Sequence, residues 1–233
     1  MNLSTLFRQG ISHLTTKTIQ DDYVMWLCNS NAGMLWKGNV YCLDYAIKNL
    51  PSNSPVVEIG SFCGLSTNII NYLLQKHSKP NTLFNCDVWK YDDYKIQFTG
   101  GITNAEYRDF VLESYRRNVL LFSKRLPHTI EATSDDFFVR WSSYADEIDM
   151  FNSNVELGGS ISMAYIDGCH TYDQTKKDFL NVDMFLEIGG FILFDDSTDG
   201  SDIGSADFMR EMKINARYET VMKNPNYLFR KIK

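Results

Sequence analysis

Short apolar runs alternate with amphipathic segments through most of the chain, and this alternation limits the possible folds more than any other feature. Strands are expected at residues 56–59, 82–86, 129–132, 161–166 and 191–194, and helices at 40–50, 65–74, 104–124 and about 172–186. Strands joined through helices lie parallel, and a parallel sheet must be covered on both faces. The sequence therefore predicts a doubly wound α/β domain with a mostly parallel sheet.

The two ends of the chain depart from this alternation. Residues 217–223 and 227–232 alternate in polarity and are joined by Asn224-Pro225-Asn226, which predicts an antiparallel hairpin at the end of the sheet. The first 35 residues mix apolar and polar positions as short amphipathic helices do. We expect residues 1–35 to form an extension, either a cap or a packed segment, and residues 36–233 to form one domain.

Composition narrows the class of protein. The 233 residues are 44% hydrophobic, enough for one sizeable core, and the formal net charge of -6 leaves no basic stripe suited to nucleic acid. No apolar run approaches the roughly 20 residues of a membrane helix, and the first ten residues lack a signal-peptide stretch. We therefore expect a cytoplasmic protein without nucleic acid or membrane partners, and self-association into a homo-oligomer stays open. The five cysteines are odd in number, widely separated and without CxxC spacing, so neither a disulfide framework nor a zinc site is indicated. We expect Cys28, Cys42, Cys63, Cys86 and Cys169 to be reduced thiols, as in the cytoplasm.

The loop after the first expected strand has the pattern E-x-G-x-x-x-G. Gly60 and Gly64 permit a tight turn, and Asp87, which follows the second expected strand, is placed to accept the hydroxyls of a ribose. This combination indicates an adenosyl ligand. Phe62 stands where dinucleotide-binding loops need a glycine for the pyrophosphate, which disfavours NAD and FAD and favours S-adenosylmethionine (SAM). Taken alone, the glycine pattern also fits an ordinary strand-to-helix turn.

Acidic residues follow the fourth and fifth expected strands, residues 161–166 and 191–194. One strand ends in Asp167-Gly168-Cys169-His170 and the other in Asp195-Asp196, so three carboxylates are expected at one edge of the sheet. Such carboxylates repel one another unless a cation lies between them, and oxygen ligands select Mg²⁺, Ca²⁺ or Mn²⁺. His170 is placed to act as a base. The alternatives are that the aspartates stabilise a turn and that His170 is a surface or helix-start histidine.

The chain resembles the class I SAM-dependent methyltransferases, whose seven-stranded sheet ends in an antiparallel hairpin. Its glycine loop is similar to the catechol O-methyltransferase loop E-L-G-x-Y-C-G-Y-S. Its later motifs resemble the I-D-G-x-H and D-D signatures of metal-dependent methyltransferases that act on macrolide sugars. The resemblance implies that Asp167, Asp195 and Asp196 bind a divalent cation, Mg²⁺ above all, and that His170 is the general base. It also implies that SAM contacts Glu58, Gly60, Ser61, Phe62, Gly64, Ser66, Asp87, Thr133, Ser134, Asp135 and Asp167.

These features predict a SAM-dependent methyltransferase that methylates a hydroxyl group of a small molecule such as a sugar, polyketide or catechol-like acceptor. Residues 89–102 and the aromatic side chains of Phe137, Phe138 and Trp141 are candidates for the acceptor pocket, or for plain packing. Two other functions are considered. A SAM-binding protein without catalysis is disfavoured by the four polar residues Asp167, His170, Asp195 and Asp196, and a nucleotide-dependent oxidoreductase is disfavoured by Phe62.

Overall fold

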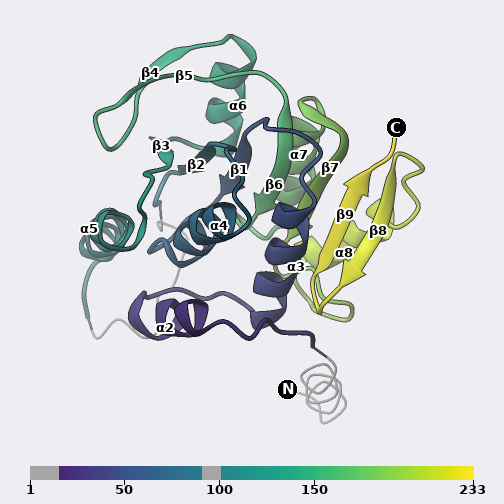
Figure 1. Cartoon of the computed structure of the whole chain (residues 1–233), viewed down its shortest axis with the longest axis horizontal. Coiled ribbons are helices and arrows are strands. Elements are labelled where there is room, and N and C mark those ends of the chain that lie inside the picture. The colour runs from purple at the N-terminus through teal and green to yellow at the C-terminus, as the bar shows by residue number, and fades with distance from the viewer. Residues whose placement is uncertain (1–15, 91–100) are drawn as a thin grey trace.

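The computed structural model describes residues 16–90 and 101–233, and its centre is a seven-stranded sheet (Figure 1). Its strands are β1 (Val56–Ile59), β2 (Leu83–Asp87), β3 (His128–Glu131), β6 (Ile161–Ile166), β7 (Leu186–Phe194), β8 (Tyr218–Lys223) and β9 (Tyr227–Lys231). Their order across the sheet is β3-β2-β1-β6-β7-β9-β8. The first five are parallel, and β9 runs antiparallel to both β7 and β8. The predicted doubly wound sheet with a C-terminal hairpin is confirmed.

Helices cover both faces of this sheet (Figure 1). The described helices are α2 (Asp22–Ser30), α3 (Lys37–Lys48), α4 (Leu65–Lys76), α5 (Asn104–Phe122), α6 (Ser134–Ser142), α7 (Tyr172–Asp183) and α8 (Gly204–Met212). One core cluster joins α2, α3 and α4 to the sheet, a second joins α6, α7 and α8 to it, and a third, smaller cluster packs α5 against Cys63 and Trp89. Within β1, Val56 belongs to the first cluster and Val57 to the second, because successive side chains of a strand point to opposite faces.

The described part of the N-terminal extension packs onto the domain. Asp21 caps α2 by accepting hydrogen bonds from the N–H groups of Tyr23 and Val24, and the side chains of Val24 and Leu27 are buried in the cluster with α3 and α4. Residues 1–15 lie outside the described part of the chain. No helix within the described ranges has both the length and the apolar character needed to cross a bilayer.

Several elements differ from the sequence-based expectation. The helix α7 ends at Asp183, and β7 begins at Leu186 and continues through Gly189 and Gly190, whereas we expected these glycines to end the helix. The strand gains this length because Leu186 pairs with Ile161 before a register shift. The helices α6 and α8 and a separate hairpin of β4 (Asp146–Ile148) and β5 (Asn154–Glu156) were not expected. These segments are short, so neighbouring contacts decide their structure more than periodicity does.

The start of α3 is pressed against the turn between β8 and β9. A Cβ atom added to Gly38 would lie 1.7 Å from the carbonyl oxygen of Asn224. The side-chain amide of Asn224 donates to the carbonyl oxygen of Gly38 (3.1 Å) and to that of Lys17 (2.8 Å), and its Oδ1 accepts from the N–H of Lys17 (2.7 Å). Segments more than 180 residues apart therefore meet at this point.

We expect Gly38→Ala to lower the free energy of unfolding by about 1 to 3 kcal/mol, because the added methyl group forces the hairpin turn away from α3. Urea denaturation of the variant and the wild type measures this difference. Lys48→Ala, an exposed change at the other end of α3, is the control and should have a much smaller effect. Equal stability of the Gly38→Ala protein and the wild type would contradict the tight contact.

Candidate functional site

The strand order reverses between β1 and β6, and this reversal locates the candidate site. From β1 the chain proceeds outward to β2 and β3 on one side, and then returns to β6 and β7 on the other. Ligands of doubly wound sheets bind at such a reversal, beyond the carboxyl ends of the strands. The loops after β1, β2, β3, β6 and β7 all lie at this edge. The candidate site residues lie in these loops or in the strand ends and first helical turns next to them.

The glycine loop after β1 is closely packed against the loop after β6. Gly60 has a φ of +84°, and a Cβ atom at this position would lie 2.1 Å from the carbonyl oxygen of Asp167. Gly64 has a φ of +86° and begins α4. Only glycine adopts such angles without strain, so both glycines are required by the backbone. The loop and Asp167 are thus neighbours, as a shared site requires.

Asp87 lies beside the glycine loop. Its Oδ2 accepts hydrogen bonds from the N–H groups of Ser61 (2.8 Å) and Phe62 (3.0 Å), and its Oδ1 accepts one from the N–H of Trp89 (2.7 Å). Burial raises the pKa of Asp87, and these N–H groups offset part of the effect. The carboxylate therefore shapes the loop, and Oδ1, which accepts only one of these bonds, retains a lone pair for a further donor such as a ribose hydroxyl.

Glu58 is fully buried at the base of the same loop. Its Oε2 accepts hydrogen bonds from the hydroxyl groups of Thr67 and Ser61, the latter at 3.4 Å. Its Oε1 has no hydrogen-bond partner among the described residues. Burial raises the pKa of Glu58 to about 7, although neighbouring hydroxyl groups lower it in part. A buried carboxyl with an unpaired oxygen under a glycine loop is suited to a polar ligand group. Ser66 is buried nearby, in the first turn of α4.

The residues expected beside adenine begin α6. Thr133 caps this helix by accepting a hydrogen bond from the N–H of Asp136 (3.1 Å), and Ser134 donates to Oδ1 of Asp178 on α7 (2.5 Å). Asp135 accepts from the side-chain amide of Asn181 (3.0 Å). All three follow β3, at the edge of the sheet where the parallel strands end. Their side chains also stabilise the start of α6 and its contact with α7.

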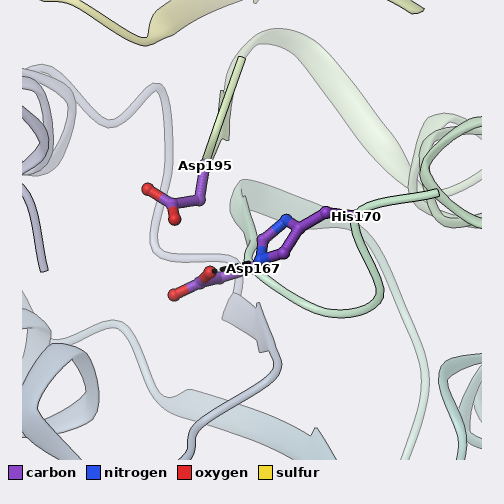
Figure 2. Close-up of side chains that lie close together, drawn as sticks. All are labelled: Asp167, His170 and Asp195. Atoms are coloured by element: carbon purple, nitrogen blue, oxygen red, sulfur yellow. Dashed lines mark ion pairs between the residues drawn. The ribbon is translucent and has the colours of Figure 1, made fainter. Parts of the chain in front are cut away.

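Asp167, His170 and Asp195 form a cluster at the ends of β6 and β7. Each offers one ligand atom, and these atoms all lie within 4.8 Å of one another. Figure 2 shows His170 and Asp195 approaching Asp167 from the two loops. The Nε2 atom of His170 lies 3.7 Å from Oδ1 of Asp167. The two strand-end motifs are thus brought together.

Asp196 lies at the border of this cluster. Its Oδ2 is 3.8 Å from Nε2 of His170, and its Oδ1 accepts a hydrogen bond from the indole N–H of Trp36 (3.2 Å). The residue has a φ of +47°, an uncommon value outside glycine. Asp196 therefore lies beside His170 and is not one of the three residues of the cluster.

The carboxylates in the cluster are close enough to oppose each other's ionisation. Burial, followed by the charge of Asp195, raises the pKa of Asp167 well above its usual range. Burial, followed by the charge of Asp196, raises the pKa of Asp195. A divalent cation between them would remove this repulsion, and their oxygens are the donors that Mg²⁺ and Mn²⁺ prefer. The residues present therefore fit a hard cation.

The structure decides between the two alternatives, acceptor pocket and plain packing, for one group of aromatic residues. Phe137, Phe138 and Trp141 are buried in the core between α6 and the sheet, so they contribute packing and not an acceptor pocket. Trp89 is also buried, and its indole N–H donates to the carbonyl oxygen of Phe62 (2.9 Å). Residues 91–100 of the other candidate segment lie outside the described part of the chain.

Sequence reasoning missed the residues that support the cluster from other elements. Trp36 precedes α3, Asn39 lies in its first turn, and Asn226 lies in the turn between β8 and β9. Both asparagine side chains donate to Asp195. An asparagine in a helix or turn is common, and no spacing connects positions 39, 195 and 226, so only the tertiary structure identifies them.

A doubly wound sheet that ends in an antiparallel hairpin, with a glycine loop after its first strand and an acidic residue after its second, defines a class I SAM-dependent methyltransferase. The family model described as a methyltransferase domain matches residues 57–197, and the chain belongs to this family. The matched range includes the glycine loop, Asp87 and the cluster of Asp167, His170 and Asp195. No curated protein matches the chain at the level of sequence.

Solved structures of similar fold cover nearly the whole chain. The SAH-bound methyltransferase PaMTH1 from Podospora anserina has 12% sequence identity and a TM-score of 0.57, with 100% of this chain and 97% of that chain covered. The SAM complex of the O-methyltransferase TomG from Streptomyces achromogenes has 12% identity and a TM-score of 0.54, with 96% and 94% covered. CalS11, a TDP-rhamnose 3′-O-methyltransferase, has 14% identity and a TM-score of 0.51, with 82% and 76% covered. At these identities the similarity establishes the fold.

The buried carboxyl of Glu58 should make stability depend on pH. Its pKa of about 7 in the folded protein exceeds the ordinary value of 4.5, so folding favours the protonated form. As the pH rises from about 4.5 to about 7, the wild type should lose roughly 3 kcal/mol of unfolding free energy relative to Glu58→Gln, which does not titrate. Urea denaturation of both proteins at pH 5 and pH 8 tests this, and parallel pH profiles would contradict it.

Proposed function

We propose that this methyltransferase transfers the methyl group of SAM to a hydroxyl oxygen of a small molecule, with the help of a divalent cation, Mg²⁺ above all. The observation that carries the proposal is the gathering of Asp167, His170 and Asp195 beside the glycine loop, with Gly60 in contact with the main chain of Asp167. A methyl donor on the loop and a hydroxyl group at the cluster would then be neighbours.

The proposal assigns two roles to the cluster. Asp167 and Asp195 hold the cation, with Asp196 beside them, because carboxylate oxygens are the preferred ligands of Mg²⁺ and imidazole is not. His170 removes the proton of the acceptor hydroxyl, since its Nε2 lies within 4 Å of carboxylate oxygens of both Asp167 (3.7 Å) and Asp196 (3.8 Å), beside the proposed cation site. When bound, SAM supplies an electrophilic methyl group and the cation supplies positive charge that lowers the pKa of a nearby hydroxyl.

The same assignment gives the SAM-binding residues. Gly60, Ser61, Phe62 and Gly64 contribute the main chain of the loop, and Asp87 receives the ribose hydroxyls on the side of β2. Glu58, at the end of β1, and Ser66, in the first turn of α4, support the two ends of the loop. Thr133, Ser134 and Asp135 flank the adenine. Support comes from the hydrogen bonds that place Asp87 against Ser61 and Phe62.

A sugar hydroxyl is the acceptor class we favour. The sequence has His170 and the pair Asp195-Asp196 where macrolide-sugar methyltransferases have their histidine and aspartate signatures, and CalS11, which has the same fold, is named for a sugar substrate. An exposed indole also borders the cluster, since Trp36 is 42% exposed and donates to Asp196. Aromatic faces of this kind are suited to packing against a sugar or another flat apolar surface.

SAM binding should depend on Asp87. Calorimetric titration of the wild type is expected to show binding of SAM and none of NAD, because Phe62 replaces the glycine that a pyrophosphate needs. Asp87→Asn should weaken SAM binding about tenfold or more through the loss of a charged acceptor. Asp146→Asn, an exposed change on β4, serves as the control. Tight NAD binding, or SAM binding that is unaffected by Asp87→Asn, would contradict the assignment.

Cation dependence and the role of His170 can be separated in one set of assays. Excess chelator should abolish turnover, and added Mg²⁺ should restore it. His170→Ala should lower kcat by about 10² to 10⁴-fold while Mn²⁺ and SAM affinities stay near those of the wild type, because a general base does not hold the cation. Full activity in chelator would reject the cation. A parallel loss of Mn²⁺ affinity in His170→Ala would make this residue a ligand instead of a base.

A further inference from the structure

Two side-chain amides from distant segments hold one oxygen of Asp195. Asn39 on α3 and Asn226 in the turn between β8 and β9 both donate through Nδ2 to Oδ1 of Asp195, the latter at 3.1 Å. Both asparagines are completely buried, and Asp195 is 5% exposed. Buried amides that converge on one carboxylate oxygen fix its orientation, since each lost hydrogen bond would leave a buried polar group unpaired.

The orientation of each amide is set by its other contacts. Oδ1 of Asn226 accepts hydrogen bonds from the N–H of Ser197 and the hydroxyl of Thr198, both at 2.9 Å. Its Nδ2 also donates to Oδ1 of Asn39 at 3.0 Å. Because the oxygen of each amide is engaged by donors, its NH₂ group must face Asp195. The network therefore has a single consistent arrangement.

Contacts between α3, the loop after β7 and the hairpin turn hold the main chain around both asparagines. Gly38 allows α3 to touch the hairpin turn, and the side chain of Asn224 bonds to the main chain of Gly38 and Lys17. The N–H of Ser197 follows Asp195 and Asp196 directly, so the loop after β7 is tied to the same turn. The hairpin turn thus supports the cluster although it contributes no candidate ligand.

We propose that Asn39 and Asn226 are positioning residues that orient Asp195 for cation binding. This inference rests on the proposed function. Both amides bond to Oδ1, so the carboxylate cannot rotate without breaking them, and Oδ2 receives neither amide. Neutral amide donors hold the side chain and add no charge that would repel a cation. Residues that orient metal ligands in this way affect metal affinity by about 10 to 100-fold.

The test compares cation affinity with stability in matched variants of the full chain. Asn39→Leu removes the amide and keeps the size of the side chain. Asn81→Leu is the control, because Asn81 is equally buried but donates to the carbonyl oxygens of Ser52 (2.8 Å) and Ser54 (2.7 Å), before β1. Mn²⁺ binding is followed by electron paramagnetic resonance, SAM binding by calorimetry, and stability by thermal unfolding without metal.

Asn39→Leu is expected to raise the Kd for Mn²⁺ about tenfold or more and to leave the Kd for SAM within about twofold of the wild type. Asn81→Leu should lower the melting temperature and leave the Kd for Mn²⁺ unchanged. Asn226→Ser, which is too short to reach Asp195, should weaken Mn²⁺ binding similarly and provides the measurement if leucine at position 39 prevents folding. An unchanged Kd for Mn²⁺ in the variants that fold would overturn the inference while the proposed function stands. Absence of Mn²⁺ binding by the wild type would overturn both.

Discussion

The close approach of Gly60 to the main chain of Asp167 is the contact on which the candidate site depends. It occurs between β1 and β6, where the order in which the chain adds strands to the sheet reverses. A side chain at position 60 would collide with the carbonyl oxygen of Asp167. The contact brings a loop suited to an adenosyl ligand against a cluster suited to a hard cation. Because the two loops belong to neighbouring parallel strands, the sheet holds them together.

A second constraint is the concentration of buried negative charge. Glu58, Asp87, Asp167 and Asp195 all have pKa values raised by burial, and all lie near one edge of the sheet. Such a group of carboxyls destabilises an empty site and favours ligands that bring positive charge. SAM carries a positive sulfonium centre, and a divalent cation carries more, so both proposed ligands have the sign that this environment selects.

The support of the cluster comes from parts of the chain that do not belong to the glycine loop or to the strand-end motifs. The family match ends at residue 197, yet Asn226 in the C-terminal hairpin donates to Asp195, and Trp36 and Asn39 reach the same aspartate pair from before the match begins. The hairpin and the segment around α3 therefore also donate hydrogen bonds to Asp195 and Asp196. They connect the two ends of the domain to the place where the chemistry is proposed.

Strand periodicity and the glycine loop are local patterns, so the sheet, the C-terminal hairpin and the residues at the strand ends could be predicted from the sequence. The reversal between β1 and β6 then brings Gly60, Asp87, Asp167 and Asp195 to one edge. The packing of distant segments, which no local pattern encodes, buries Phe137 and Trp141 in the core, carries β7 through its two glycines and sets Asp196 beside His170 and Trp36. It also brings Asn39 and Asn226 together, since the contact between α3 and the hairpin turn joins positions that no local pattern relates.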